Sequence, residues 1–332
     1  MTVFHPPALL KNRHIQSICA STGPRRLVVM HRAKQLLASS KTILLNGGHS
    51  ATESSIRLQA ELSLHPNSKG LVILLHGWEG SANSLYLLSA GAALFKEGYS
   101  ICRVNLRDHG STHHLNRELF NSTRVAEVVH AIGDLQQRYP QENNFLAGFS
   151  LGGNFSLRIA LRAPENDLRL NKVVAVCPVI NPAKTTRTLS DGWWVYHRYF
   201  VHKWQTSLAK KLTHFPELGY ENILPKLSTL DEMNNYFVPN FTPYKTTAAY
   251  FSGYAIDNET LKDLAIPCHL IATEDDPVIA IEDLQHISRP ESLTVEVHKY
   301  GGHCGFINSY ALDSWIDNRL VQLFNEARPK SC

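Results

Sequence analysis

The residues best suited to chemistry form one short segment, Gly148-Phe149-Ser150-Leu151-Gly152. It follows the apolar run Asn144–Ala147 and opens a helical pattern that continues from Gly153. In a Gly-x-Ser-x-Gly turn between a buried strand and a helix, the backbone holds the serine hydroxyl clear of the sheet, and glycine fits where the two elements pass closely. We therefore expect Ser150 to act as a nucleophile beside the positive end of a helix dipole.

A serine hydroxyl becomes a good nucleophile when a base takes its proton. His303 follows Gly301-Gly302 and the last strand-like run of the chain. An imidazole titrates near neutral pH and can accept and return a proton. We expect His303 to be this base.

A carboxylate must hold the histidine ring in the right tautomer. The run Glu274-Asp275-Asp276 offers three. Asp276 is our first choice because the turn-forming Pro277 and apolar residues follow it, with Asp275 as the alternative acid and Glu274 less favoured. Neighbouring side chains on an extended backbone point in opposite directions, so only one acid is expected to face His303.

The oxyanion of an acyl-transfer reaction needs hydrogen-bond donors. A His76-Gly77-Trp78 segment directly follows the apolar run Leu71–Leu75. We expect the backbone amides of Trp78 and Leu151 to form an oxyanion hole, in which one donor is worth roughly 3 kcal/mol of barrier.

Short apolar runs alternate with helical patterns, which predicts an α/β fold with a mostly parallel central sheet flanked by helices. The period-2 pattern Ile56–Leu64 predicts an antiparallel edge strand. The other expected strands are Leu71–Leu75, Ser100–Leu106, the strand from Asn144 that carries Ser150, Lys172–Cys177, Cys268–Ala272 and Leu293–His298. The expected helices are Asn83–Glu97, Thr123–Tyr139, Leu151–Ala163 and Ile307–Ala327.

The alternation stops at Asn181, where a segment rich in aromatic residues begins. We predict one α/β domain spanning residues 1–332, with a core at about 57–180 and 263–328. A helical cap is expected at about 181–262, and an N-terminal extension at about 1–56. The aromatic residues of the cap suit either core packing or a pocket for an acyl chain.

The chain has 332 residues, 43% of them hydrophobic, and a formal net charge of +4. It contains no run of basic residues interleaved with aromatic residues, a pattern that would indicate a nucleic-acid-binding surface. None of its six cysteines forms a C-x-x-C pair, which favours a reduced, cytoplasmic protein. We expect no signal peptide and no membrane span from this sequence.

His109, His113 and His114 lie close together in the sequence. Their spacing matches no recognised zinc pattern. We therefore expect no metal and no cofactor.

The motifs together resemble the α/β-hydrolase superfamily and, more narrowly, its YheT-like group (the AB hydrolase 4 family). The resemblance implies a Ser-Asp-His relay made of Ser150, Asp276 and His303, and an activity on carboxylic esters. The matching segments are the N-terminal signature Phe4, Pro6, Pro7, Leu10, Asn12, His14 and Gln16, followed by His76–Ser81, Gly148–Gly153, Asp275–Pro277 and Gly301–Phe306.

The residues and the resemblance predict a serine hydrolase that cleaves small-molecule acyl esters through an acyl-enzyme. One alternative is an acyltransferase that uses the same triad with an alcohol acceptor. Another is a hydrolase-like binding protein without turnover. The oligomeric state stays open.

Overall fold

The computed structural model describes residues 4–328 of the chain. Residues 1–3, part of the N-terminus in which we expect no signal peptide, and residues 329–332, which include Cys332, lie outside the described residues. Within residues 4–328, no helix is both long enough and apolar enough to cross a membrane.

An eight-stranded sheet organises the chain, in the order β1-β2-β4-β3-β5-β6-β7-β8. β1 pairs antiparallel with β2, and β2 antiparallel with β4, whereas the other neighbours pair in parallel. This confirms the predicted fold class, and the six predicted strands from Leu71 onward agree with β3 to β8 to within two residues at each end. The strands are β1 Ser40–Asn46, β2 Arg57–Ser63, β3 Leu71–Leu75, β4 Ser100–Val104, β5 Asn144–Phe149, β6 Lys172–Val176, β7 Cys268–Thr273 and β8 Leu293–His298.

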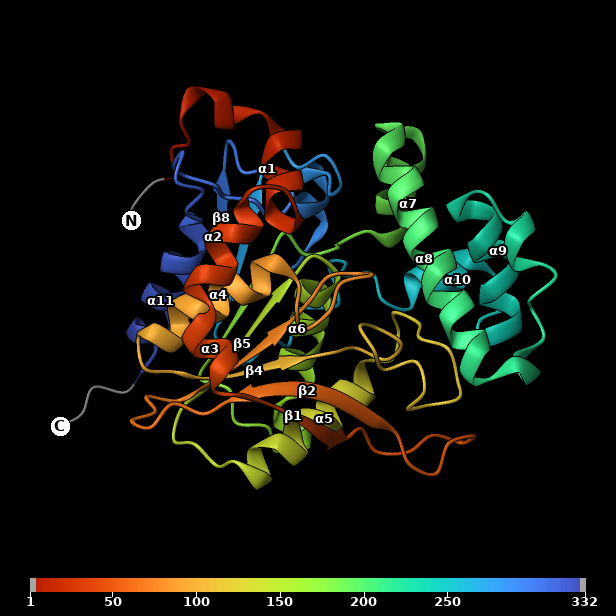
Figure 1. Cartoon of the computed structure of the whole chain (residues 1–332), viewed down its shortest axis with the longest axis horizontal. Coiled ribbons are helices and arrows are strands. Elements are labelled where there is room, and N and C mark those ends of the chain that lie inside the picture. Colours follow the sequence, from red (N-terminus) through yellow and green to blue (C-terminus); the bar gives the residue numbers. More distant parts are fainter. Residues whose placement is uncertain (1–3, 329–332) are drawn as a thin grey trace.

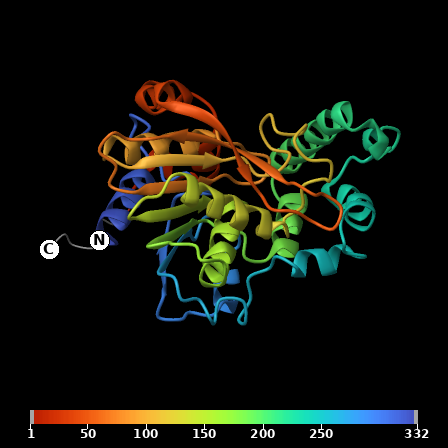
Figure 2. The same ribbon diagram turned by 90° about the horizontal axis from the view of Figure 1, so that it is seen from below.

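Helices cover both faces of the sheet (Figures 1 and 2). Ile73 of β3 packs in one hydrophobic cluster with residues of α5 and α6, whereas Leu74 packs in another with residues of α4 and α11. Successive side chains of a strand point to opposite faces, so a fully apolar strand needs a helix layer on each side. These helices are α4 Leu85–Lys96, α5 Val125–Arg138, α6 Leu151–Arg162 and α11 Trp315–Glu326, with short 3-10 turns at Pro164–Asn166 and Ile281–His286.

The N-terminal segment adds a strand that the sequence pattern did not predict. β1 lies outside β2, so the prediction of an edge strand at Ile56–Leu64 was wrong, although its antiparallel direction is confirmed. Within β1 only Ile43 and Leu45 are buried, and the residue between them is the 43% exposed Leu44, so the sequence shows no alternation of apolar and polar residues. The segment also forms the 3-10 turn Ala8–Lys11 and helices α1 Arg13–Ser21, α2 Arg25–Arg32 and α3 Lys34–Ala38.

The last helix begins at Trp315, so the predicted start at Ile307 was wrong. The Ile307 N–H donates to the side chain of Gln16 at 2.7 Å, and Ile307 forms a β-bridge with Ser314. Leu312 has a φ of 62°, which no α-helix accommodates. The apolar spacing of this segment resembles that of a helix. Its contacts with α1 nevertheless hold it as an extended loop.

Between β6 and β7 the described chain forms helices and no strand. Asn181, Thr229 and Thr246 each accept a backbone N–H at the start of a helix, which satisfies donors that the helix leaves free. We call α7 to α10 the cap helices; in Figure 1 they lie together to one side of the sheet. They are α7 Pro182–Asp191, α8 Trp194–His214, α9 Leu230–Phe241 and α10 Thr247–Ser252, with 3-10 turns at Pro216–Leu218 and Leu224–Lys226.

A buried ion pair joins the cap helices to the loop after β4. The Lys211 ammonium of α8 donates to the Asp108 carboxylate at 2.7 Å and to the Asn116 carbonyl at 2.5 Å. The two charged side chains are only 1% and 7% exposed. Burial lowers the pKa of Lys211 and raises the pKa of Asp108, while their mutual attraction opposes both shifts. Each charge therefore depends on the other for its place in the interior.

Replacing Lys211 by Met should leave the buried Asp108 carboxylate without its counter-charge. We expect the free energy of unfolding, measured by urea denaturation, to fall by about 3–5 kcal/mol. Adding Asp108→Asn should restore part of this loss, because the uncompensated charge is removed. The control is Lys262→Met, whose exposed partner Glu259 lies 2.9 Å away; an exposed pair contributes at most about 1 kcal/mol. Equal losses in the two lysine variants would contradict the role assigned to the pair.

Candidate active site

Ser150 occupies the turn between β5 and α6 in a left-handed backbone conformation, with φ 56° and ψ −118°. A non-glycine residue in this region carries strain of order 1–3 kcal/mol. The Ser150 N–H donates to the Val176 carbonyl at 2.9 Å, which ties the turn to the neighbouring strand β6. The turn is therefore fixed by the sheet.

Two glycines allow this turn to pack. A Cβ atom on Gly148 would collide with the Gly152 carbonyl group, and a Cβ on Gly152 would lie 2.5 Å from the Leu75 carbonyl oxygen. Real Cβ atoms do not come this close to backbone. The pattern Gly-x-Ser-x-Gly is thus a steric requirement of bringing α6 against β3 and β5.

His303 hydrogen-bonds to both other members of the expected relay. Its Nε2 lies 2.9 Å from the Ser150 hydroxyl oxygen, and its Nδ1 lies 2.8 Å from an Asp276 carboxylate oxygen. The Asp276 side chain is 3% exposed. Its other oxygen accepts the backbone N–H groups of Val278 at 2.8 Å and Ile279 at 3.0 Å, which orients it.

The three acids of the 274–276 segment point in different directions. Asp275 accepts the Gly302 N–H at 2.9 Å, so it supports the backbone of the histidine loop instead of its ring. Burial raises the pKa of Asp275. Glu274 is exposed, with its N–H bonded to the His298 carbonyl. Of the three, only Asp276 lies against the His303 ring.

The surroundings of His303 favour its charged form. Burial alone lowers its pKa, but the negative charge of Asp276, its hydrogen bond and the neighbouring Cys304 outweigh burial and raise the pKa to about 9. An imidazolium that forms when the ring accepts a proton is thus stabilised at this position.

The loop after β3 lies directly beside Ser150. A Cβ on Gly77 would lie 3.1 Å from the Ser150 Cβ. Among residues 4–328, no acceptor bonds the Trp78 N–H or the Leu151 N–H. Leu151 is the first residue of α6, where backbone N–H groups lack partners within the helix. Both amides therefore have no hydrogen-bond partner among the described residues, as an oxyanion hole requires.

His76 holds this loop in shape. Its Nδ1 lies 2.7 Å from the Gly77 carbonyl and its Nε2 accepts the Leu106 N–H at 3.1 Å. Burial lowers the pKa of His76 to about 3, so the ring is neutral at physiological pH. His76 is therefore a structural residue of the loop.

Ser150 and His303 open into a cavity of about 1210 Å³ between the sheet and the cap helices. Trp78 also lines it, and its ring stacks on Phe200 of α8 at 5.2 Å between centroids. Glu79 is an acid in the wall that the sequence did not single out; burial raises its pKa to about 8. Much of the remaining wall is apolar and comes from the cap helices and the loop after β6, including Val179, Leu189, Leu230, Phe237, Val238 and Phe251.

Helix α1 supports the histidine loop, a role that the sequence did not reveal. The Ser17 hydroxyl accepts the His303 N–H at 2.8 Å, and the Gln16 side chain bonds Ile307 through both its oxygen and its nitrogen. Asn12 caps the start of α1 by accepting the His14 N–H at 2.9 Å. The N-terminal signature that carried the resemblance thus holds a segment near the other end of the chain.

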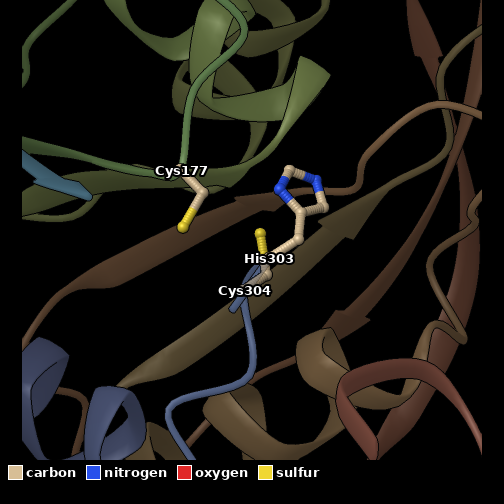
Figure 3. A group of neighbouring side chains, drawn as sticks. All are labelled: Cys177, His303 and Cys304. Atoms are coloured by element: carbon tan, nitrogen blue, oxygen red, sulfur yellow. The ribbon is translucent and has the colours of Figure 1, made fainter. Parts of the chain in front are cut away.

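The three histidines of the 109–114 segment make separate contacts. His109 Nδ1 lies 2.7 Å from the Arg107 carbonyl, His113 Nε2 lies 2.9 Å from the Ser207 hydroxyl, and His114 packs on the ring of His214. Within residues 4–328, the donor atoms that lie close enough together to surround a metal ion belong instead to Cys177, His303 and Cys304. Figure 3 shows both thiols pointing into the same space beside the His303 ring.

Comparison with known proteins agrees with this architecture. The chain matches the family model of the alpha/beta hydrolase fold over residues 70–310. It is 26% identical to YheT of Escherichia coli (strain K12) over 274 residues, which are 80% of this chain and 79% of that protein. It is 22% identical to a monoacylglycerol lipase of Saccharomyces cerevisiae over 279 residues, 78% of this chain and 60% of that protein.

Solved structures with the same fold include two esterases. Esterase Pf2001 of Pyrococcus furiosus aligns with a TM-score of 0.55 at 17% identity, over 86% of this chain and 92% of that one. Carboxylesterase CesB of Bacillus subtilis aligns with a TM-score of 0.53 at 17% identity, over 91% and 99%. The family match covers most of the sheet and reaches past His303. The chain belongs to the alpha/beta hydrolase fold family.

Proposed function

We propose that this chain is a serine hydrolase that cleaves carboxylic esters through an acyl-enzyme intermediate. The observation that carries the proposal is the hydrogen-bonded series Ser150–His303–Asp276 at the wall of a large, mostly apolar cavity. In this proposal residues 57–180 and 263–328 form the catalytic core, residues 181–262 form the cap over it, and residues 1–56 form the N-terminal extension.

In the first half of the reaction, the Ser150 oxygen attacks the ester carbonyl as its proton moves to His303 Nε2. Asp276 accepts the hydrogen bond from Nδ1 and stabilises the imidazolium. The Trp78 and Leu151 amides bind the oxyanion. The intermediate then collapses, and the departing alkoxide takes the proton from His303.

In the second half, water attacks the acyl group on Ser150 and gives its proton to His303. Collapse of the second tetrahedral intermediate releases the carboxylic acid, and His303 returns the proton to the Ser150 oxygen. The cycle restores every group of the site, so no resident metal or cofactor is part of the proposal.

The acyl part of the ester is assigned to the apolar end of the cavity beneath α7, α9 and α10. Burying a methylene group is worth about 0.8 kcal/mol. A cavity of about 1210 Å³ exceeds the volume that a short acyl group fills. We therefore propose esters with an extended apolar acyl chain as the preferred substrates.

Replacing Ser150 by Ala should abolish hydrolysis of p-nitrophenyl butyrate, because no acyl-enzyme can form. A fluorophosphonate probe should label the parent protein and leave the variant unlabelled, while thermal unfolding of the two stays similar. Undiminished turnover in the variant would remove the assignment. Labelling and hydrolysis both absent from the parent protein would indicate a binding protein.

The two neighbouring aspartates should differ in their effect on turnover. Asp276→Asn should lower kcat roughly 10⁴-fold, because the amide favours the wrong tautomer of His303. Asp275→Asn is the matched control and should cost less than about tenfold, because the amide oxygen can still accept the Gly302 N–H. Comparable losses in both would show that the relay is assigned to the wrong acid.

Filling the apolar end of the cavity should shift the preferred acyl length. Val238 of α9 lines the cavity and is 3% exposed. Val238→Trp should lower kcat/KM for long-chain p-nitrophenyl esters at least about tenfold, with little change for the acetate ester. Val297→Trp, at a position 43% exposed on β8, is the control. An unchanged chain-length profile in Val238→Trp would place the acyl group elsewhere.

A further inference from the structure

Two thiols lie beside the histidine of the relay. Cys177 directly follows β6, and Cys304 directly follows His303. The two sulfur atoms and a ring nitrogen of His303 all lie within 4.8 Å of one another. The two cysteines are 1% and 4% exposed, and Figure 3 shows their sulfur atoms directed into a common space beside the ring.

The backbone fixes both thiols in place. Cys177 has a φ of 44° and Cys304 a φ of 62°, both in the left-handed region. The Cys177 N–H donates to the Ile271 carbonyl at 2.7 Å, and the Cys304 thiol faces the Val176 carbonyl at 3.8 Å. The donors are therefore held by the strand ends and the histidine loop in a defined arrangement.

A set of two thiolates and one imidazole is typical of zinc sites. Zinc lies about 2.3 Å from sulfur and about 2.0 Å from nitrogen in a tetrahedral arrangement, which places neighbouring ligand atoms roughly 3.5–3.8 Å apart. The three donors thus need to approach by about 1 Å to surround an ion.

We propose that Cys177, Cys304 and His303 form a binding site for a thiophilic cation such as Zn²⁺, and that the bound ion switches the hydrolase off. Both thiols bind as thiolates and release their protons to solvent. The remaining coordination position is left to a water molecule or another small ligand.

The ion can reach this site through the substrate cavity. Cys304 and His303 both line the cavity that also exposes Ser150. Cys177 lies behind them, so the ion would pass the relay before it meets the second thiol. A bound substrate and the ion therefore compete for access.

The inhibition follows from the hydrogen bonds of His303, and this part of the inference rests on the proposed function. One ring nitrogen faces Ser150 at 2.9 Å and the other faces Asp276 at 2.8 Å. Each nitrogen has a single lone pair or proton to offer. An ion bound to either one breaks a hydrogen bond of the relay and removes the base.

The test begins with hydrolysis of p-nitrophenyl butyrate at increasing ZnCl₂. We expect reversible inhibition that EDTA relieves. Replacing a residue that only hydrogen-bonds to a metal ligand already weakens metal binding about 10–100-fold. Cys177→Ser and Cys304→Ser each remove a ligand itself, so each should raise the Zn²⁺ concentration needed for inhibition by at least this factor. The inhibition of each variant is expressed as a fraction of its own rate without metal. Cys19→Ser, which removes the half-exposed thiol of α1, is the control and should keep the parent value.

Binding is measured separately in the Ser150→Ala protein, where activity plays no part. Cd²⁺ should produce a thiolate-to-cadmium charge-transfer absorption that saturates at one equivalent. The band should be lost when either Cys177 or Cys304 is replaced by serine. If a serine variant does not fold, the titration uses Cys177→Ala or Cys304→Ala in its place.

These readouts separate the two proposals. A cadmium band in the Ser150→Ala protein, together with a parent protein that shows no esterase activity, would sustain the metal site and remove the proposed function. Equal zinc inhibition of the parent, Cys177→Ser and Cys304→Ser proteins, or a cadmium titration without a thiolate band, would overturn the metal site.

Discussion

The left-handed backbone of Ser150 is the constraint on which the site depends. It turns the chain from β5 into α6 within one residue and is held by the hydrogen bond to Val176 in the adjacent strand. The turn is possible because Gly148 and Gly152 carry no side chain where backbone meets backbone. The strain is thus supported by the fully buried strand β5, and the hydroxyl is presented at one fixed point at the carboxyl edge of the sheet.

The cap helices shape the site as well as cover it. The Trp78 ring stacks on Phe200, so the loop that we propose to supply one oxyanion donor rests on α8. The same helix is tied to the loop after β4 by Lys211 and Asp108. A displacement of α8 would therefore change the shape of the cavity and the position of the loop next to Ser150 together.

Local patterns predicted the parts of the fold that depend on local sequence. The continuous apolar run of β3 and the glycine-flanked Ser150 were readable because burial on two faces and a close helix–strand contact each restrict residue type directly. β1 has only two buried apolar side chains, and its place in the sheet depends on pairing with β2. The loop from Ile307 to Ser314 takes its shape from Gln16, a partner that no local pattern can show.

For the site, the chain order of Ser150, acid and His303 was enough to propose the relay, but the choice between Asp275 and Asp276 needed side-chain directions. The two aspartates are neighbours in the sequence. In the structure Asp276 contacts the His303 ring, whereas Asp275 accepts the backbone N–H of Gly302.

The contact between Ser17 and His303 has a further consequence for how the protein is made. Ser17 of α1 and His303 are separated by 286 residues in sequence. A nascent polypeptide must therefore keep α1 available until His303 has been synthesised, and the histidine loop gains this support only after both segments have been made.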